Sequence, residues 1–191
     1  MNRRIPLIAG AMIATFALFS AGCTTSGGSQ GEPAARAAAM DADIDRALSQ
    51  LRQQARGADQ LLASAKGVLV FPSVVSAGFM VGGSHGLGGL RKDGKTTRHF
   101  RMTAASVGLL AGARTKTVVY LFMTDQALQS FEASSGWTIG ADASVTVLTV
   151  GANAQIDTQS ARQPVIGFVF TNAGLMGNLS MDGTRIAPTT L

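Results

Sequence analysis

The sequence predicts an α+β protein, with a curved antiparallel β-sheet or barrel-like β domain, an N-terminal helical segment and one further helix. Three observations support this class. Helical periodicity is confined to the region before residue 66 and to one later segment, apolar–polar alternation dominates the rest, and 23 of the 191 residues are glycine. Glycines within strands are typical of bends and of close backbone approach, so the sheet is expected to curve.

The first 22 residues have the pattern of a secretory leader. Arg3 and Arg4 precede an apolar run from residue 5 to 19, which is shorter than the roughly 20 residues needed to span a bilayer. Ala21-Gly22-Cys23 resembles the lipobox of bacterial lipoproteins, whose cysteine is acylated after cleavage. We therefore expect residues 1–22 to be a signal peptide and Cys23, the only cysteine, to carry a covalent lipid.

A tether and a single domain are expected to follow the anchor. Residues 24–35 are small, polar and Gly-rich, which is typical of a flexible linker, and residues 36–191 suffice for one domain. Thr24 stands where an aspartate would favour retention in the inner membrane, by the sorting rule that the lipoprotein resemblance implies. The expected location is therefore the bacterial cell envelope, anchored to the outer membrane and facing the periplasm.

Two helical segments open the domain. Apolar residues recur at helical spacing from Met40 to Arg56, and a second, shorter helical stretch covers residues 58–65. The period then changes to that of a strand over residues 67–71, which Pro72 is expected to end.

Residues 76–90 alternate as a long strand that is rich in glycine. The larger side chains would share one face and are expected to point inward, with His85 as a packed polar residue among them. The other face would carry only small residues, namely Ser76, Gly78, Gly82, Ser84, Gly86 and Gly88.

Asp93-Gly94 predicts a two-residue hairpin turn, with residues 96–103 as the returning strand. In the simplest register Lys92 faces Lys95, Gly88 faces His99, Gly86 faces Arg101, and Leu87 faces Phe100, which gives an apolar face and a basic face above a floor of glycines. A bulge near the turn would shift the partners by one residue and exchange the two faces.

The remaining elements follow from alternation, turns and one helix cap. Thr124 is a natural N-cap for a helix through Glu132. Strands are expected at residues 106–113, 117–123, 137–147, 165–171 and 174–181, and Asp182-Gly183 is expected to turn the chain into a last short strand.

Several motifs resemble the SYLF domain family, in order from about residue 57 to 186. They are Ala65-Lys66-Gly67-Val68-Leu69-Val70-Phe71-Pro72, Ala77-Gly78-Phe79, Gly82-Gly83 and Gly140-Ala141-Asp142-Ala143-Ser144-Val145. This resemblance implies a lipid-binding, β-rich domain with helices. The lysine-rich N-terminal segment that binds membranes in eukaryotic members is not matched, because residues 34–66 carry five basic and four acidic residues. Actin binding and phosphoinositide specificity are therefore not carried over.

Basic residues concentrate around the expected hairpin, where residues 91–116 hold seven cations and only Asp93 as an acid. Like charges opposite each other in a hairpin repel, which favours a cluster kept for an anionic partner. Solvated lysines that block strand aggregation are the alternative, and Arg101 could instead pair with Asp142, whose expected role is structural. The candidate head-group ligands are Arg91, Lys92, Lys95, Arg98 and Arg101.

Other chemistries find little support in the sequence. His85 and His99 are the only histidines, and no metal-like spacing or P-loop occurs, so we expect neither an enzyme nor a cofactor. Nucleic acid is excluded as a partner by the leader and by the scarcity of aromatic residues in the basic segment. An apolar lipid cavity formed by Phe79, Val81, Leu87, Phe100 and Met102 is a weaker alternative.

Together these features predict a membrane-anchored envelope lipoprotein whose SYLF-like domain binds phospholipid, through anionic head groups at the basic hairpin. The alternative is a structural or adaptor lipoprotein that binds a protein partner in the envelope.

Overall fold

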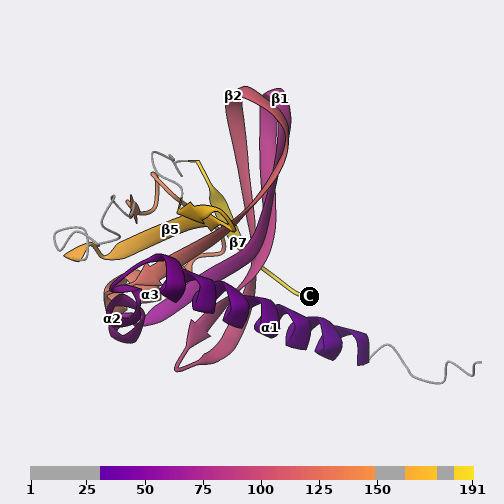
Figure 1. Cartoon of the computed structure of the whole chain (residues 1–191). Coiled ribbons are helices and arrows are strands. Elements are labelled where there is room, and N and C mark those ends of the chain that lie inside the picture. The colour runs from indigo at the N-terminus through magenta and orange to yellow at the C-terminus, as the bar shows by residue number, and fades with distance from the viewer. Residues whose placement is uncertain (1–30, 149–161, 176–182) are drawn as a thin grey trace, which may run out of the picture.

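The computed structural model describes residues 31–148, 162–175 and 183–191, and it gives only the backbone of residues 31, 79–80, 106–112 and 175. Within this part of the chain three helices flank one curled sheet of seven strands, which confirms the predicted α+β class (Figure 1). The strand order is β3-β7-β2-β5-β4, with β1 also paired to β2 and β6 to β5. The pairs are antiparallel except that of β4 with β5.

Two very long strands form the centre of the fold. The helices are α1 (Gly31–Gln54), α2 (Ala58–Ser64) and α3 (Asp125–Ala133). The strands are β1 (Gly67–Lys92), β2 (Lys95–Phe122), β3 (Trp137–Thr138), β4 (Thr146–Val147), β5 (Val165–Thr171), β6 (Gly174–Leu175) and β7 (Arg185–Thr189).

Helix α1 begins at Gly31, earlier than the start predicted at Met40. Residues 31–35, expected to be tether, are therefore helical. The run from residue 34 to 39 is rich in alanine, the strongest helix former, and Pro33 is tolerated because it lies in the first turn. Cys23 and the leader lie outside the described residues.

Strands β1 and β2 are each continuous where two or three shorter strands were expected. Pro72 does not end β1, because the pairing with β2 shifts between Phe71 and Val74 and so leaves the proline at an irregularity of the ladder. The hydroxyl of Thr117 on β2 donates a hydrogen bond to the Pro72 carbonyl at 2.9 Å. The local hydrogen bonding thus continues across the proline.

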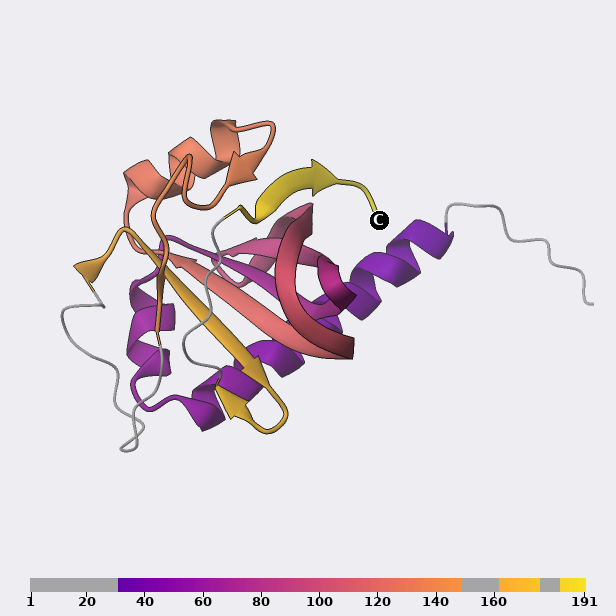
Figure 2. The ribbon, with the colours of Figure 1, turned by 90° about the horizontal axis from the view of Figure 1, so that it is seen from above.

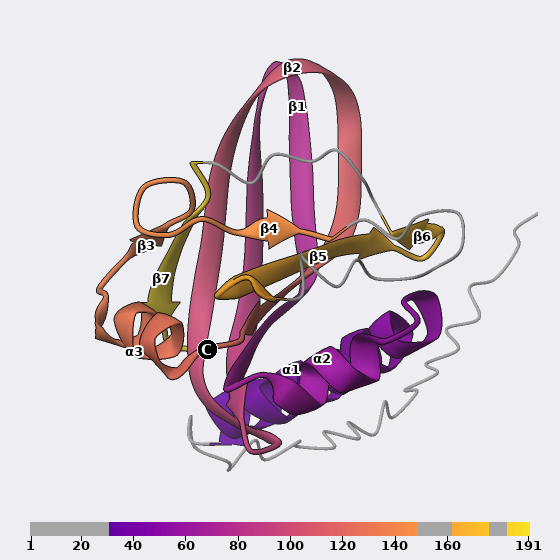
Figure 3. The ribbon, with the colours of Figure 1, turned by 90° about the vertical axis from the view of Figure 1, so that its left-hand side faces the viewer.

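The β1–β2 hairpin bends back on itself to form an arch, made of residues 74–87 and 101–116, that rises from the rest of the molecule (Figures 1 and 3). Viewed from above, the two strands curl over (Figure 2). The limbs of β1 approach so closely that a Cβ on Gly88 would lie 2.1 Å from the Val70 carbonyl oxygen. Higher up, the hydroxyls of Ser76 and Ser84 lie 2.8 Å apart. The expected bending and close backbone approach are confirmed.

The inner face of the arch is the face with small residues. Val81, His85 and Leu87, which were expected to point inward, are exposed. The reason is steric, because a Cβ on Gly78, Gly86 or Gly88 would lie within 3 Å of a neighbouring atom, so the space between the limbs does not admit a large side chain from each of them. The alternation was therefore predicted correctly but its direction was wrong.

The register is as predicted at Lys92 opposite Lys95 and then shifts by one residue. Thr97 is left without a partner strand residue, since Arg91 pairs with Thr96 and Leu90 with Arg98. The Thr97 hydroxyl donates to the Leu90 carbonyl at 3.2 Å, which holds the bulge. Beyond it the expected pairs are wrong: the observed ones are Gly89 with His99, Gly88 with Phe100, Leu87 with Arg101 and Gly86 with Met102.

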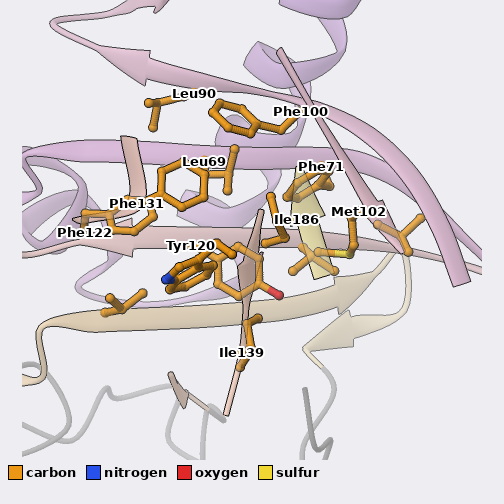
Figure 4. Packing of buried hydrophobic residues seen from close by; sticks show 14 of the residues in the cluster. Leu69, Phe71, Leu90, Phe100, Met102, Tyr120, Phe122, Phe131, Ile139 and Ile186 are labelled. Carbon is orange, nitrogen blue, oxygen red and sulfur yellow. The ribbon is translucent and has the colours of Figure 1, made fainter. Parts of the chain in front are cut away.

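Hydrophobic cores cover both faces of the lower sheet. Along β2, Tyr120 and Phe122 face α3 and Trp137, whereas Val119 and Leu121 face α1 and α2. Figure 4 shows the first core, where aromatic rings from β2, α3 and β3 meet; the Phe122 and Phe131 centroids are 4.8 Å apart. Because both faces are buried, β2 and β5 read as apolar runs.

The segment predicted as one strand over residues 137–147 is instead β3, a turn and β4. Gly140 has a left-handed φ of 90°, and the Asp142 carboxylate accepts a 2.6 Å hydrogen bond from the Thr138 backbone N–H. These features close a turn, and Asp142 has the structural role expected for it. The α3 cap at Thr124, β5 and the last strand are confirmed, while residues 176–181 of the predicted strand 174–181 lie outside the described residues.

The close approach of the two limbs predicts unequal effects of two alanine substitutions in β1. Gly88→Ala should lower the free energy of unfolding by at least about 2 kcal/mol, because its Cβ would meet backbone atoms that cannot move independently. Gly83→Ala is the matched control, since its Cβ would lie 3.7 Å from the nearest atom. It should change stability by less than about 0.5 kcal/mol in urea unfolding. Equal effects would contradict the arch.

Candidate functional site

The predicted basic residues begin at the turn between β1 and β2. Asp93 and Gly94 have φ values of 50° and 77°, as a two-residue hairpin turn requires, so the predicted turn is confirmed. Lys92 and Lys95 pair directly across it. Neighbouring strand residues point to opposite faces of a sheet, and this alternation separates the cations that follow.

Arg91 points toward α1. Its Nη1 lies 2.5 Å from Asp45 Oδ1, and its Nη2 donates to the Asp41 carbonyl at 3.2 Å. The side chain is only 13% exposed. Arg91 therefore fastens the hairpin tip to α1, and its charge is balanced within the protein.

Lys92 and Arg98 point the other way, toward the end of α3. Lys92 Nζ lies 3.1 Å from Glu132 Oε2, and Arg98 Nη1 donates to the Glu132 backbone carbonyl at 3.1 Å. The Arg98 guanidinium also lies 5.5 Å from the centre of the Phe100 ring. Cations at a helix C-terminus interact favourably with its dipole, so both residues stabilise the contact with α3.

A cleft of about 790 Å³ near the tip is lined by charges of both signs. Arg91 and Lys92 contribute to it, but so do the carboxylates of Asp45, Asp125 and Glu132. The tip is therefore not a continuous basic face. The structure does not bring the five predicted residues into one cluster.

Lys95 and Arg101 are both exposed, and neither forms an ion pair with the described residues. Arg101 lies on β2 opposite Leu87, on the outer face of the arch. The alternative partner Asp142 binds the Thr138 backbone instead. His99 lies opposite Gly89 and lines a separate cleft with Pro33 and the C-terminal residues.

Two further cations lie in the basic segment but were not among the predicted ligands. Arg114 pairs with Ser76 and is exposed, and Lys116 pairs with Val74. Burial lowers the pKa of Lys116. The sequence could have pointed to both residues, because the stretch from residue 94 to 124 contains five cations and no carboxylate.

The proposed apolar cavity is not formed by the residues expected to line it. Phe100 and Met102 are buried in the core that contacts α3, whereas Val81 and Leu87 are exposed on the outer face of β1. One-residue displacement at the bulge explains this separation. The side chain of Phe79 is not described.

Neither a membrane-spanning helix nor a metal-binding cluster occurs among the described residues. No helix among them has the length and apolarity to cross a membrane. No three His, Cys, Asp or Glu side chains in the described ranges lie close enough together to hold a metal ion.

The fold and the charge pattern define a class of protein: a curled β domain with helical flanks and a strongly basic strand, which suits a binding role. The family model Ysc84, described as Las17-binding protein actin regulator, matches residues 103–190. The match begins within β2 and ends one residue before the last residue of the sequence. The SYLF domain family expected from the sequence is confirmed by this match. The assignment supports binding of the lipid or actin-adaptor kind. No curated protein matches the chain.

The family match includes Arg114, Lys116 and Asp142 but not the hairpin tip. Of the motifs that carried the resemblance, Gly140 to Val145 lies inside the match and the three earlier ones lie before it.

The contacts of Arg91 predict that it contributes to stability while Lys95 does not. Arg91→Ala should lower the free energy of unfolding by about 1–2 kcal/mol, because it removes a mostly buried stem and the bonds to α1. Lys95→Ala removes the same charge from an exposed site and should change stability by less than about 0.5 kcal/mol. Urea unfolding of both variants measures the difference. An unaffected Arg91→Ala variant would show that the contact with α1 is not stabilising.

Proposed function

We propose that this chain is a lipid-anchored protein of the bacterial cell envelope whose folded domain binds anionic phospholipid, and that it is not an enzyme. The observation that carries the proposal is the composition of β2. From Lys95 to Phe122 this strand bears Lys95, Arg98, Arg101, Arg114 and Lys116, and no carboxylate.

Four of these cations are exposed and have no ion pair with the described residues. Arg98 among them already donates to the Glu132 backbone carbonyl, which leaves Lys95, Arg101 and Arg114. Each cation near an anionic bilayer contributes about 1 kcal/mol, so three can give measurable binding. Because the Debye length shortens as salt is added, this binding should weaken at high ionic strength. Of the five residues first considered, Arg91 and Lys92 already have carboxylate partners, so we assign the head-group role to the exposed cations.

A covalent lipid on Cys23 would supply most of the membrane affinity. One acyl chain gives only marginal attachment, so stable anchoring requires several chains or a chain and a basic surface. The proposed anchor and the basic strand would act together in this way. Outer-membrane placement is the location that the residue after the cysteine favours.

The head-group assignment predicts which charge changes weaken vesicle binding. Residues 23–191 with Cys23→Ser keep both cores, which are built from residues 44–186, and lack the acylation site. Arg101→Gln with Arg114→Gln should reduce co-sedimentation with phosphatidylglycerol vesicles at low salt by about tenfold or more. The matched control, Arg46→Gln with Arg56→Gln, removes the same net charge from α1 and its C-terminal flank and should have little effect. Equal losses would indicate that only net charge matters and would refute the assignment.

The anchor makes a separate prediction for the full chain expressed in bacteria. Cys23→Ser should move the protein from the membrane fraction to the soluble fraction, because the folded domain alone binds weakly and reversibly. Fractionation with and without high-salt washing measures this. A substituted chain that stays with the membrane after the wash would contradict anchoring through Cys23.

The family description favours a second candidate, a protein partner, since it names a protein as the ligand of its members. In that case crosslinking in the envelope would capture the same protein with the Arg101→Gln/Arg114→Gln variant, and vesicle binding would be absent.

A further inference from the structure

The part of the arch farthest from the helices has no hydrophobic core of its own. The large buried side chains of β1 occur up to Val74 and again from Leu90, and those of β2 up to Met102 and again from Val118. Between these positions the limbs of β1 are joined by contacts between glycines and serines; a Cβ on Gly78 would lie 2.3 Å from the Gly82 Cα. The arch therefore has no interior that could bury large apolar side chains.

Nevertheless β1 exposes large apolar side chains on the outside of the arch. Among the residues whose side chains are described, the exposed large hydrophobic ones are Val75, Val81 and Leu87, with exposed fractions of 46%, 68% and 36%. All three lie on the outer face of β1 within the arch. Such a gathering of exposed apolar side chains on one projection is typical of an interaction site.

Charged residues are absent from the crest and present at its base. Residues 77–90 of β1 and 102–113 of β2 contain no Asp, Glu, Lys or Arg. The bend contributes Phe79 and Met80 from β1, and Val107, Leu109 and Leu110 from β2, to this uncharged stretch. This composition is typical of a segment that enters an apolar environment.

Three cations of β2 lie at one level of the arch, below the crest. Arg114 pairs with Ser76, Lys116 with Val74 and Arg101 with Leu87. The two limbs meet at this same level, because a Cβ on Gly86 would lie 2.8 Å from Val74 Cγ2. We call Arg101, Arg114 and Lys116 the collar. The acidic side chain recorded near this level is Asp43 of α1, which lines a shallow pocket with Val75 and Leu87 and pairs with Arg46.

We propose that the crest of the arch, residues 77–85 and 103–112, enters the interface of an anionic bilayer while the collar contacts the lipid phosphates. This inference rests on the proposed phospholipid binding and assigns it a site. Charge complementarity selects the occupant, since an apolar crest above a group of cations matches acyl chains beneath anionic head groups.

The depth of insertion is limited by the backbone. In hydrocarbon every N–H and C=O needs a partner. Apart from Thr103, which pairs with Arg185 of β7, the crest is a two-stranded ribbon whose outer edges have no sheet partner among the described residues. The crest can therefore enter only the boundary between head groups and acyl chains, about 5–10 Å deep, where water still reaches.

A single cysteine probe tests the orientation. The chain with Cys23→Ser has no other cysteine, so Val81→Cys can be labelled with an environment-sensitive fluorophore; Ser130→Cys on the exposed side of α3 is the control. With phosphatidylglycerol vesicles the Val81 label should brighten at least twofold and be quenched by a nitroxide near the head groups but not by one deep in the acyl chains. The Ser130 label should not respond.

Two results would overturn the inference, and they can be distinguished. If co-sedimentation of the same samples detects binding but the Val81 label stays in water, phospholipid binding stands and the crest is not its site. If neither labelled chain sediments with any vesicle, the proposed function fails as well.

A charge variant gives an independent test. Val81→Asp should reduce vesicle binding about tenfold, because burying one carboxylate opposes insertion. Ser130→Asp adds the same charge on α3 and should not. Both sites are exposed, so urea midpoints should match that of the parent chain. Undiminished binding by Val81→Asp would refute insertion of the crest.

Discussion

The structure depends on the contact between the two limbs of β1. Where Gly88 passes the Val70 carbonyl there is no space for a Cβ, and higher up Gly86 and the serine pair impose the same closeness. This contact folds a hairpin of more than 50 residues in half, which no single flat sheet would accommodate. The lower half can then lie between two cores, and the upper half projects from them.

The arrangement divides the molecule into a packed region and a projecting one. In the packed region β2 alternates between two cores, so its residues are determined by burial on both faces. In the projection, backbone pairing and small residues maintain the shape, and the outer side chains are released from packing. Such freedom is typical of surfaces that carry function. The cations are divided in the same way: Arg91, Lys92 and Arg98 attach the hairpin tip to helices, whereas Arg101 and Arg114 belong to the projection.

Much of the fold could be predicted from the sequence because its signals are local. The hairpin turn, the cap at Thr124 and the helical periodicity before residue 66 need only near neighbours, and all are confirmed. The direction of the alternating faces could not be predicted, since alternation is symmetric and only the bulge at Thr97 and the limb contact break the symmetry. The pairing of Arg91 with α1 could not be predicted either, because Asp41 and Asp45 are distant from Arg91 in sequence.

The turn at Asp93-Gly94 also has a consequence for how the chain folds. All the pairs between β1 and β2 are nested about this one turn, from Lys92 with Lys95 out to Gly67 with Phe122. Each pair that forms shortens the loop that the next pair must close, so no single step has to close a long loop and lose the corresponding entropy. The largest part of the sheet can therefore assemble progressively from a single starting point, and the small residues of β1 let it fold over as it grows.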